Sequence, residues 1–318
     1  MKNTKIEWCD STVNPTGFQC CGCELWNKTR KDCYAGIFTE RYNGEGAFTK
    51  PVVLKPGKMA EAARWSDLRG TKRQGKPWLD GRPRVIFIGD MADTLQSGVP
   101  FEFLKKEVID VVNSSEGSRH IWMWLTKQAK RLVAFQDHLY HIGFRCLNGE
   151  EWSVWPPNLW PGVSVTSERT TWRIDELVKI RSAHRFISYE PAWEYVDFSR
   201  WTCGVEHTED GKSPAPSLKL ETIICGGQSG RGAGDKPFNV QWASDLIDLC
   251  ETDQVNCFVK QLGSNCVTDN ANLHDWPETT RLRARGKAFA SARAMLSAKG
   301  GNMAEWPEEV RVRQFPEV

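Results

Sequence analysis

The feature that most constrains this chain is an alternation of short apolar runs with segments that have helical spacing. Each run has the length and composition of a buried strand. The runs are Arg84–Gly89, His120–Leu125, Trp160–Val165, His184–Ser188, Glu221–Cys225 and Asn256–Val259. The helical segments between them are Phe101–Asn113, Gln128–His141, Thr170–Arg181 and Gln241–Thr252. A strand–helix–strand order repeated this often predicts a parallel sheet with helices outside it.

The number of short buried strands favours an α/β fold of the barrel kind, a partial or closed parallel (β/α) barrel. A doubly wound open sheet is the alternative. We expect residues 1–264 to form the barrel, with a cysteine-bearing loop at residues 9–36, and residues 265–318 to form a C-terminal extension packed on it. The polar, Pro- and Gly-bearing stretch Thr202–Lys219 is predicted to be a loop insertion.

Composition excludes several classes of protein. Hydrophobic residues make up 40% of the 318 residues and charged residues 26%, and the mean hydropathy is −0.50, so a disordered or fibrous chain is not expected. No apolar run is long enough for a transmembrane helix, and the polar N-terminus has no secretory signal, so we expect a cytoplasmic protein without a membrane partner. Eleven cysteines in such a chain indicate thiol or metal chemistry rather than disulfides.

Basic charge is concentrated in two stretches. Residues 50–84 contain ten Lys or Arg against three acids, and residues 279–300 contain six and no acid. Basic charge interleaved with aromatics, here Trp65 and Trp78, suits phosphate contact and base stacking, although solvated surface loops have the same composition. The residues we expect to contact a nucleic acid are Lys72, Arg73, Lys76, Arg283 and Arg285.

Polar side chains follow the predicted strands at their carboxyl ends, which is where (β/α) barrels carry their chemistry. We expect these ends to line one functional cavity, since helix capping would explain Asp or Thr there but not Lys127, Glu190 and Lys260. Gly226 and Gly227 would allow close approach of backbone to a cofactor, or else form a tight turn. The other candidates at these ends are Asp90, Asp93, Ser164, Gln228 and Ser229.

Three cysteines form the pattern C-x2-C-x9-C in a turn-rich segment, at Cys20, Cys23 and Cys33. Thiolates suit zinc or an iron–sulfur cluster. A structural zinc site needs four ligands and would recruit Cys9 or Cys21, whereas a [4Fe–4S] cluster held by three cysteines leaves one iron open. Spacing alone leaves both possibilities.

Ten motifs follow one another along the chain: TKIEW, VNPTGFQCCGCELW, KDCYAG, FIGDMAD, WLTKQAKRL, WPGVSVTSERTTWRIDEL, RFISYEPAW, IICGGQSGRGAGDKPF, CFVKQLGSN and WPEEVRVRQFP. Taken in this order, they resemble a phage and bacterial three-cysteine family catalogued as a phage protein of unknown function. That family looks like a divergent branch of the radical S-adenosylmethionine (SAM) enzymes, distantly similar to spore photoproduct lyase. The gap before the last cysteine departs from the usual radical SAM spacing, and Gln228 and Thr166 stand where relatives often have Glu.

The resemblance implies a [4Fe–4S] cluster on Cys20, Cys23 and Cys33, with Cys21 as an alternative first ligand, and SAM chelated at the open iron. It places Tyr34 beside the adenine and offers Asp93 and Ser164 for the ribose hydroxyls or the amino group of SAM. The further cofactor-binding candidates are Asp90, Gly226, Gly227, Gln228 and Ser229. Glu190, Lys127 and Lys260 match the family pattern and are the expected catalytic residues, unless Glu190 pairs internally with a lysine.

The implied function is a radical SAM enzyme that modifies or repairs a nucleic acid or nucleotide. Its partners would be that substrate, an electron donor such as flavodoxin or ferredoxin, and a genetically linked protein. Two alternatives stay open at this point: a zinc-stabilised nucleic-acid-binding protein without catalysis, and a radical SAM enzyme acting on a peptide or partner protein.

Overall fold

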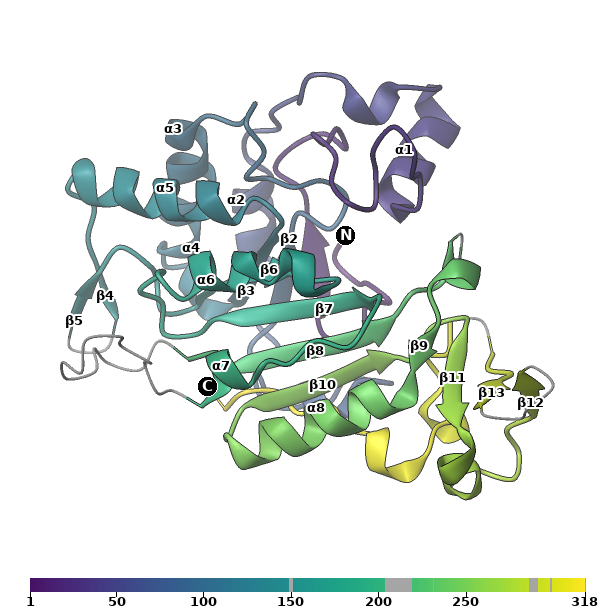
Figure 1. Cartoon of the computed structure of the whole chain (residues 1–318). Helices are drawn as coiled ribbons and strands as arrows, with labels where there is room; N and C mark the ends of the chain where they lie inside the picture. The colour runs from purple at the N-terminus through teal and green to yellow at the C-terminus, as the bar shows by residue number, and fades with distance from the viewer. Residues whose placement is uncertain (149–150, 204–218, 231, 286–290, 298, 318) are drawn as a thin grey trace, which may run out of the picture. The chain divides into compact units, whose positions relative to one another are not determined.

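The computed structural model describes residues 1–148, 151–203, 219–230, 232–285, 291–297 and 299–317 (Figure 1). Contacts divide the chain into two compact units. Unit 1 holds residues 1–163 and 173–185, and unit 2 holds residues 164–172 and 186–317. Each unit contains parallel strands followed by helices, so the predicted α/β class is confirmed.

Unit 1 is built on parallel strands in the order β1-β2-β3-β6. Nearly all of their residues are buried, which explains why three of the four read as apolar runs in the sequence. A separate antiparallel pair, β4-β5, accompanies them. The bounds are β1 Ser11–Val13, β2 Val85–Ile88, β3 Ile121–Thr126, β4 Cys146–Asn148, β5 Glu151–Ser153 and β6 Leu159–Ser164.

Tryptophans fill much of the core of unit 1, and their indole N–H groups have partners there. Trp122 Nε1 donates to the carbonyl of Gly117 over 2.8 Å, and Trp155 Nε1 donates to Oε1 of Gln136 over 3.0 Å. Buried indoles keep their hydrogen bond while burying a large apolar area. The abundance of tryptophan in this chain is therefore in good part a packing feature.

The helices of unit 1 alternate with its strands. The predicted helix Phe101–Asn113 is found as one continuous helical segment with a π-helical turn at Lys105–Ile109 in its middle. The predicted helix Thr170–Arg181 is shorter, because the regular helix ends at Leu177. The bounds are α1 Tyr34–Asn43, α2 Lys58–Ala63, α3 Phe101–Leu104, α4 Asp110–Val112, α5 Ala129–His141 and α6 Trp172–Leu177.

Unit 2 contains parallel strands in the order β7-β8-β10, with α8 packed along β10 (Figure 1). The amphipathic pattern of α8 buries Leu246, Ile247 and Cys250, and Asn239 caps its N-terminus by accepting a hydrogen bond from Gln241 N. The bounds are β7 Phe186–Ala192, α7 Ser199–Thr202, β8 Thr222–Gly227, α8 Val240–Thr252 and β10 Asn256–Gln261.

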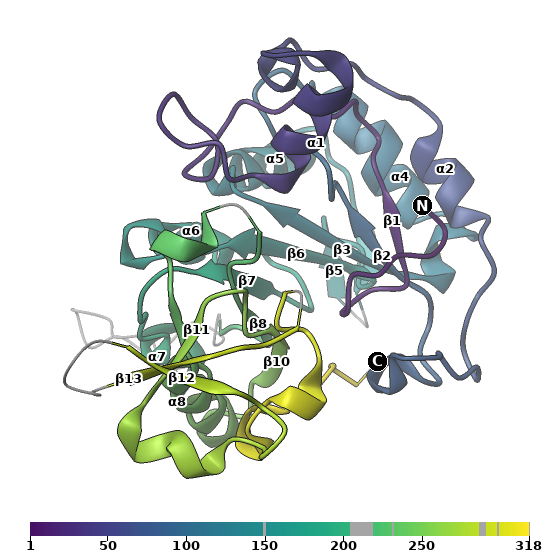
Figure 2. The ribbon, with the colours of Figure 1, turned by 90° about the vertical axis from the view of Figure 1, so that its right-hand side faces the viewer.

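Unit 2 also carries a second sheet, in the order β12-β13-β11-β9, whose strands β11, β12 and β13 lie side by side in Figure 2. Its bounds are β9 Phe238–Asn239, β11 Cys266–Asp269, β12 Leu282–Arg285 and β13 Ser291–Ala294. Residues 265–317, expected to form an extension, thus belong to the same unit as β7, β8 and β10.

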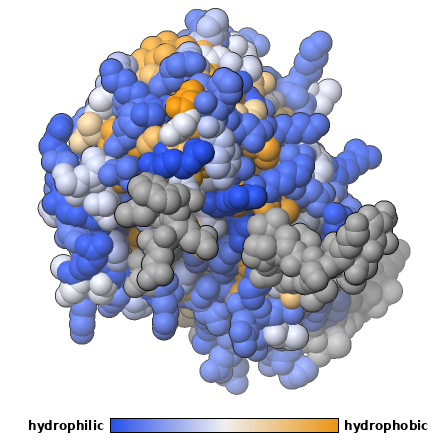
Figure 3. All heavy atoms as spheres, turned by 90° about the vertical axis from the view of Figure 1, so that its left-hand side faces the viewer, coloured by the Kyte–Doolittle hydropathy of each residue, from blue (hydrophilic) through white to orange (hydrophobic). Residues whose placement is uncertain are grey.

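Short 3-10 helices punctuate the loops of both units, at Ala47–Thr49, Pro77–Leu79, Gly117–Arg119, Glu168–Thr170, Ala233–Asp235, Asn270–Asp275, Met303–Glu305 and Glu308–Val310. None of the helices within the described ranges is long and apolar enough to cross a membrane. Hydrophilic side chains dominate the face drawn in Figure 3, with hydrophobic ones in small groups. Most of the predicted loop insertion at Thr202–Lys219 lies outside the described residues.

Candidate functional site

Three parallel strands of unit 1 end beside one another, and polar residues follow each of them. Asn14 follows β1 and Asp90 comes shortly after β2, and their side chains meet, with Asn14 Nδ2 donating to Asp90 Oδ1 over 2.6 Å. The same amide accepts a hydrogen bond from Met91 N over 3.1 Å. Burial raises the pKa of Asp90 despite the hydrogen bond from Asn14. Asp90 therefore belongs to a partly buried polar edge, as predicted.

Asp93, a candidate for binding the ribose hydroxyls or the amino group of SAM, accepts hydrogen bonds from its own unit. Its carboxylate accepts hydrogen bonds from the hydroxyl of Thr126 over 2.8 and 2.9 Å and from the backbone N–H of Lys127 over 2.8 Å. It also accepts from Leu95 N over 3.0 Å. Both carboxylate oxygens are thus engaged by the chain itself. In this structure Asp93 ties the loop after β2 to the end of β3.

The cysteine loop follows β1 and is held by backbone hydrogen bonds at each cysteine. Cys20 N donates to the carbonyl of Phe48 over 2.7 Å, and Cys33 N donates to the carbonyl of Leu25 over 3.2 Å. Cys23 and Trp26 exchange both of their backbone hydrogen bonds, each at 3.0 Å. These contacts fold the loop back on itself, so residues far apart within it come close together.

A small apolar cluster packs against the cysteine loop. Trp26 packs edge-on against Phe48 with ring centroids 5.2 Å apart, and Cys20 and Cys33 both pack against this cluster. Gly36 in the first turn of α1 is needed here, because a Cβ at that position would lie 2.6 Å from the Trp26 ring. The glycine that follows the Cys-Tyr-Ala motif is thus explained by the packing of α1 on the loop.

Tyr34 is the first residue of α1, directly after Cys33. Its side chain is exposed, and its hydroxyl donates a hydrogen bond to the backbone carbonyl of Asp90. The phenol thereby links the start of α1 to the polar edge after β2. Tyr34 therefore lies beside both Cys33 and Asp90.

Two thiols of this loop, those of Cys23 and Cys33, lie close enough to Lys127 to interact with its charge. Burial raises the pKa of Cys23 to about 11 and also raises that of Cys33, while the charge of Lys127 lowers both. Burial lowers the pKa of Lys127, but Cys23, Glu24 and Cys33 raise it by more, so its ammonium stays protonated. Lys127 is partly buried and extends the end of β3. The sequence-predicted residues Cys23, Cys33 and Lys127 are therefore brought together.

Cys20 differs from the other thiols of the loop. Its pKa falls to about 6, chiefly because the neighbouring thiol of Cys21 donates a hydrogen bond to it, whereas burial acts in the opposite direction. The pKa of Cys21 is raised by the same hydrogen bond. Cys21 is exposed and accepts a hydrogen bond from Gln128 Nε2 over 3.3 Å. The two adjacent cysteines thus form an unequal pair, with the negative charge on Cys20.

An ion pair that sequence reasoning missed fixes the middle of the loop. Both guanidinium nitrogens Nη1 and Nη2 of Arg173, near the start of α6, donate to the carboxylate of Glu24, over 2.9 and 2.8 Å. Burial alone would raise the pKa of Glu24, but Arg173 and Lys127 keep it below its ordinary value. Glu24 adjoins Cys23, so this two-pronged contact holds the peptide that carries that thiol. In the sequence, Arg173 lies in the motif WPGVSVTSERTTWRIDEL. That motif predicts a helix, but it does not show that Arg173 pairs with Glu24.

The donor set of the loop suits a soft metal, but its present arrangement is open. Across the part of the chain that the structure describes, no group of three or more His, Cys, Asp or Glu side chains lies close enough to hold a metal ion. The three thiols nonetheless share one loop, in which Cys20 and Cys33 pack on the same apolar cluster and Cys23 and Cys33 lie near Lys127, and three thiolates are a recognised set for an iron–sulfur cluster. The chemistry of the donors fits such a cluster, and binding would draw the three sulfurs together.

In unit 2, the predicted residues Glu190 and Lys260 form a closed pair. Lys260 Nζ donates to both carboxylate oxygens of Glu190 over 2.7 and 2.8 Å, and each side chain is 15% exposed. The internal pairing that we had kept as the alternative for Glu190 is thus found, with Lys260 as the lysine. Lys127 belongs to the other unit and has the thiol loop for its surroundings.

The glycines at the end of β8 are explained by the packing of unit 2 itself. A Cβ on Gly227 would lie 2.5 Å from the carbonyl oxygen of Leu262 and 2.8 Å from Cβ of Phe238. A Cβ on Gly226 would lie 3.2 Å from the carbonyl oxygen of Gln261. Neither glycine has a positive φ, so the tight turn that we considered is not their reason. The close approach is made by the chain after β10.

The remaining candidates of unit 2 are also used internally. Gln228 is buried and its Oε1 accepts a hydrogen bond from Trp193 Nε1 over 2.6 Å. Ser229 lies 3.5 Å from Gln261 Nε2, at the limit of a hydrogen bond, and Ser164 is buried at the end of β6.

The basic residues chosen for nucleic-acid contact fall into three groups. Arg73 pairs with Asp10 at 3.3 Å and donates to three carbonyls, and Lys76 Nζ donates to the carbonyls of Thr4, Ile6 and Cys9. These two residues hold the N-terminal segment in place, which corrects the expectation that they face a polyanion. Lys72 and Arg283 are exposed, whereas the side chain of Arg285, in β12, lies outside the described residues.

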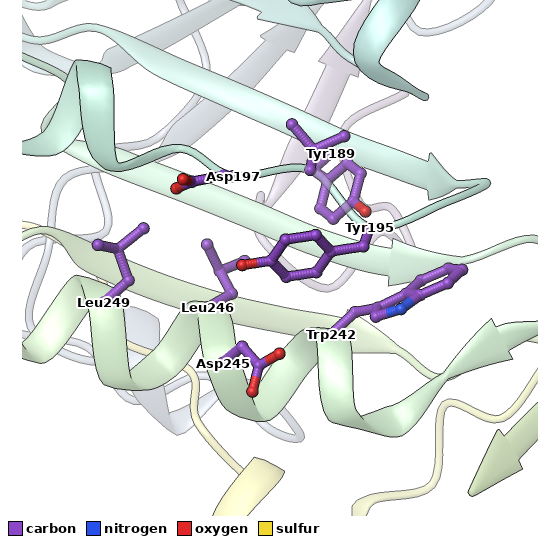
Figure 4. A pocket seen from close by; sticks show the side chains of 8 residues that line it. Tyr189, Tyr195, Asp197, Trp242, Asp245, Leu246 and Leu249 are labelled. Carbon is purple, nitrogen blue, oxygen red and sulfur yellow. The ribbon is translucent and has the colours of Figure 1, made fainter.

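A small cavity in unit 2 contains none of the expected cofactor-binding residues. Figure 4 shows Tyr195 between Asp197, Trp242 and Asp245, with Leu246 and Leu249 of α8 beneath. Its volume of about 80 Å³ is well below the size of pockets that bury a nucleotide-sized ligand. We therefore assign it no cofactor.

Comparison with known proteins gives a family without an activity. Residues 3–303 match the family described as "Protein of unknown function (DUF5131)". Neither the curated proteins nor the solved structures yield a match to this chain. Since the matched region covers nearly the whole sequence, the chain belongs to the DUF5131 family.

Proposed function

We propose that this protein is a radical SAM enzyme, which holds a [4Fe–4S] cluster on Cys20, Cys23 and Cys33 and acts on a nucleic acid or nucleotide. The observation that carries the proposal is the placement of these thiols in one loop, with Cys23 and Cys33 close to the charge of Lys127, at the edge where β1, β2 and β3 end. A purely structural role would not require three thiols and a lysine at one strand edge.

The surroundings of the loop support a redox-active cluster more than a closed zinc site. Cys9, one of the two candidate fourth ligands, is completely buried in unit 1. Cys21, the other, is occupied with Cys20 and Gln128. A site with three thiolates keeps a coordination position open for a second molecule, whereas a structural zinc site is closed by four ligands.

The residues of the chain would then divide the work as follows. Cys20, Cys23 and Cys33 would hold the cluster, and the charge of Lys127 would compensate the negative charge of the thiolates. Glu24 and Arg173 position the loop, and Tyr34 with Asp90 would flank the adenosyl group. A reduced [4Fe–4S] cluster supplies the electron for cleavage of the sulfonium of SAM, while the protein supplies binding and orientation.

The test is anaerobic purification followed by iron and sulfide analysis. We expect iron and sulfide in the protein, and formation of 5′-deoxyadenosine when SAM and a reductant such as reduced flavodoxin or ferredoxin are added. Tightly bound zinc without iron, together with no SAM binding, would overturn the proposal in favour of a zinc-stabilised binding protein. A genetically linked protein should be assayed as substrate in parallel with DNA and RNA, because modification of that protein alone would contradict the nucleic-acid assignment.

A further inference from the structure

The outer face of α1 carries an exposed row of aromatic side chains. Tyr34, Phe38 and Tyr42 are four residues apart, so they lie on one face of the helix, one turn after another. They are 59%, 45% and 66% exposed. A contiguous exposed patch of large aromatic side chains marks an interaction surface.

The rings of Phe18, Phe38 and Tyr42 form one surface that reaches beyond the helix. Phe38 lies 4.7 Å from Tyr42 between ring centroids, in a tilted arrangement, and 6.4 Å from Phe18, edge to face. Phe18 belongs to the loop before Cys20, and the hydroxyl of Thr39 donates to its carbonyl over 3.5 Å. We call Phe18, Phe38 and Tyr42 the aromatic row.

Cations lie directly over the rings at both ends of this row. Lys55 Nζ is 4.9 Å from the centroid of Phe18, and the guanidinium carbon of Arg41 is 5.8 Å from that of Tyr42. The position of Lys55 is built into the backbone, since Lys55 N donates to the carbonyl of Pro15 over 2.8 Å. The backbone of Lys55 is therefore held in place beside the aromatic row.

The acids of this region do not neutralise the row. Residues 28–55 contain six Lys or Arg and three acids. Asp32 is paired with Arg30 at 2.6 Å, and Glu40 accepts a hydrogen bond from Gly46 N over 2.9 Å. Glu45 is exposed in the turn after α1. The net charge of the segment is positive, so it complements an anionic partner.

We infer that the aromatic row binds single-stranded nucleic acid, with bases stacked on the rings and phosphates near Arg41 and Lys55. Exposed aromatic faces that alternate with cations are how proteins hold single strands without reading sequence. In a duplex the base faces are already stacked, so its phosphates could contact Arg41 and Lys55 but its bases could not stack on the aromatic rings. An acidic protein would likewise satisfy the charges, but it has no need of stacked aromatic faces.

This inference deepens the proposed function and rests on it for its biological meaning, because α1 begins at the residue after Cys33. A strand held on the row would pass beside the proposed cluster. Binding itself does not require the cluster, so it is measured separately from iron content. Failure of one proposal therefore leaves the other intact.

The experiment measures fluorescence anisotropy of labelled single-stranded DNA and RNA, their duplexes and an abasic oligonucleotide with the full chain, at two salt concentrations. We expect single strands to bind more tightly than duplex or abasic probes. Phe38→Ala and Tyr42→Ala should each weaken binding about tenfold. Lys55→Ala should lower the salt slope by about one.

Conservative variants separate stacking from apolar contact and from misfolding. Phe38→Tyr should bind as the parent does, whereas Phe38→Leu, which keeps the apolar character without a ring, should lose affinity as Phe38→Ala does. Tyr195→Ala, an equally exposed tyrosine of unit 2, is the matched control and should leave affinity unchanged.

Three results would overturn the inference. They are no binding of single strands at low salt, equal binding of the abasic probe, and full affinity of the Phe38→Leu variant. Equal abasic binding would make an acidic protein, such as an electron donor, the better occupant. Iron content is recorded for every preparation, so loss of the cluster with retained stacking contradicts only the proposed function.

Discussion

The cysteine loop of unit 1 and the strand ends of unit 2 were predicted to carry chemistry for similar reasons, but they are built differently. In unit 2, Glu190 is paired with Lys260, Gln228 accepts from Trp193, and Gly227 makes room for its own neighbours. In the cysteine loop, the backbone is fixed by hydrogen bonds and two thiols, those of Cys23 and Cys33, lie near Lys127, without a closed metal-ligand set among the described residues.

The difference teaches how to separate support from chemistry. A polar side chain at a strand end that is satisfied by its own unit stabilises the fold, and its removal should cost stability. The thiols of the cysteine loop, held by backbone contacts and an ion pair, retain their capacity to bind a metal. The predictions that follow test this contrast.

The largest expected effect is on iron content. Cys20→Ala, Cys23→Ala and Cys33→Ala should each lose most of the iron bound after anaerobic purification, because a cluster with three protein ligands has no spare thiolate. Their unfolding midpoints in the absence of iron should stay close to that of the parent.

Two cysteine variants serve as controls for this first prediction. Cys21→Ala and Cys146→Ala should keep their iron, since neither residue is in the proposed ligand set. Full iron in Cys20→Ala together with loss in Cys21→Ala would move the first ligand to Cys21. Unchanged iron in all three ligand variants would contradict the assignment altogether.

Next in size is the loss of stability when the unit 2 ion pair is broken. Lys260→Ala leaves the carboxylate of Glu190 nearly buried and unpaired, which should reduce the free energy of unfolding by about 3 kcal/mol. Replacing both partners, as Glu190→Gln with Lys260→Met, should recover part of the loss. Urea unfolding followed by tryptophan fluorescence measures both.

The exposed pair Lys58–Glu61 is the matched control for this second prediction. Its side chains are 49% and 56% exposed, so Lys58→Ala should cost less than about 0.5 kcal/mol. A stability unaffected by Lys260→Ala would show that the unit 2 pair is not structural. Glu190 and Lys260 would then again be candidates for catalytic residues.

A smaller loss is expected from crowding the end of β8. Gly227→Ala should reduce the free energy of unfolding by about 2 kcal/mol, because its Cβ would meet backbone and Phe238 side-chain atoms that cannot move easily. Gly234→Ala, where a Cβ meets nothing within 4 Å, is the control within the same unit. An unchanged stability of Gly227→Ala would instead point to open space beside β8 and revive the cofactor role.

How far the fold could be predicted depended on the length and burial of each element. Six of the seven parallel strands are buried apolar runs, which the sequence displays directly. The seventh, β1, has only the residues Ser11, Thr12 and Val13, and it is buried by its place beside β2 rather than by its own composition. The sheet β12-β13-β11-β9 was missed because its strands are two to four residues long.

The candidate site shows the same limit. Local spacing was enough to predict Cys20, Cys23 and Cys33 as a group, but nothing local connects Glu24 with Arg173, which are 149 residues apart. Charge along the sequence misled us for Arg73 and Lys76, because it does not show which donors are already used by backbone carbonyls. The exposure of Phe38 and Tyr42 could not be predicted either, because helical spacing does not show which face of a helix is buried against the rest of the protein.

The smallest effect, and the most direct comparison of the two regions, concerns thiol reactivity in the metal-free chain. Cys20 has a pKa of about 6 because Cys21 donates a hydrogen bond to it, whereas burial raises the pKa of Cys225 in β8. Thiolates are the reactive form, so alkylation of Cys20 should rise with pH up to about 6 and then level off, and should fall about tenfold per pH unit below that. Cys225 should not react in the folded chain. In Cys21→Ala the midpoint for Cys20 should move up toward that of an ordinary thiol, and mass spectrometry of iodoacetamide-treated protein measures all three. A Cys20 midpoint already at the ordinary value in the parent chain would mean that the loop does not hold a thiolate before metal binds.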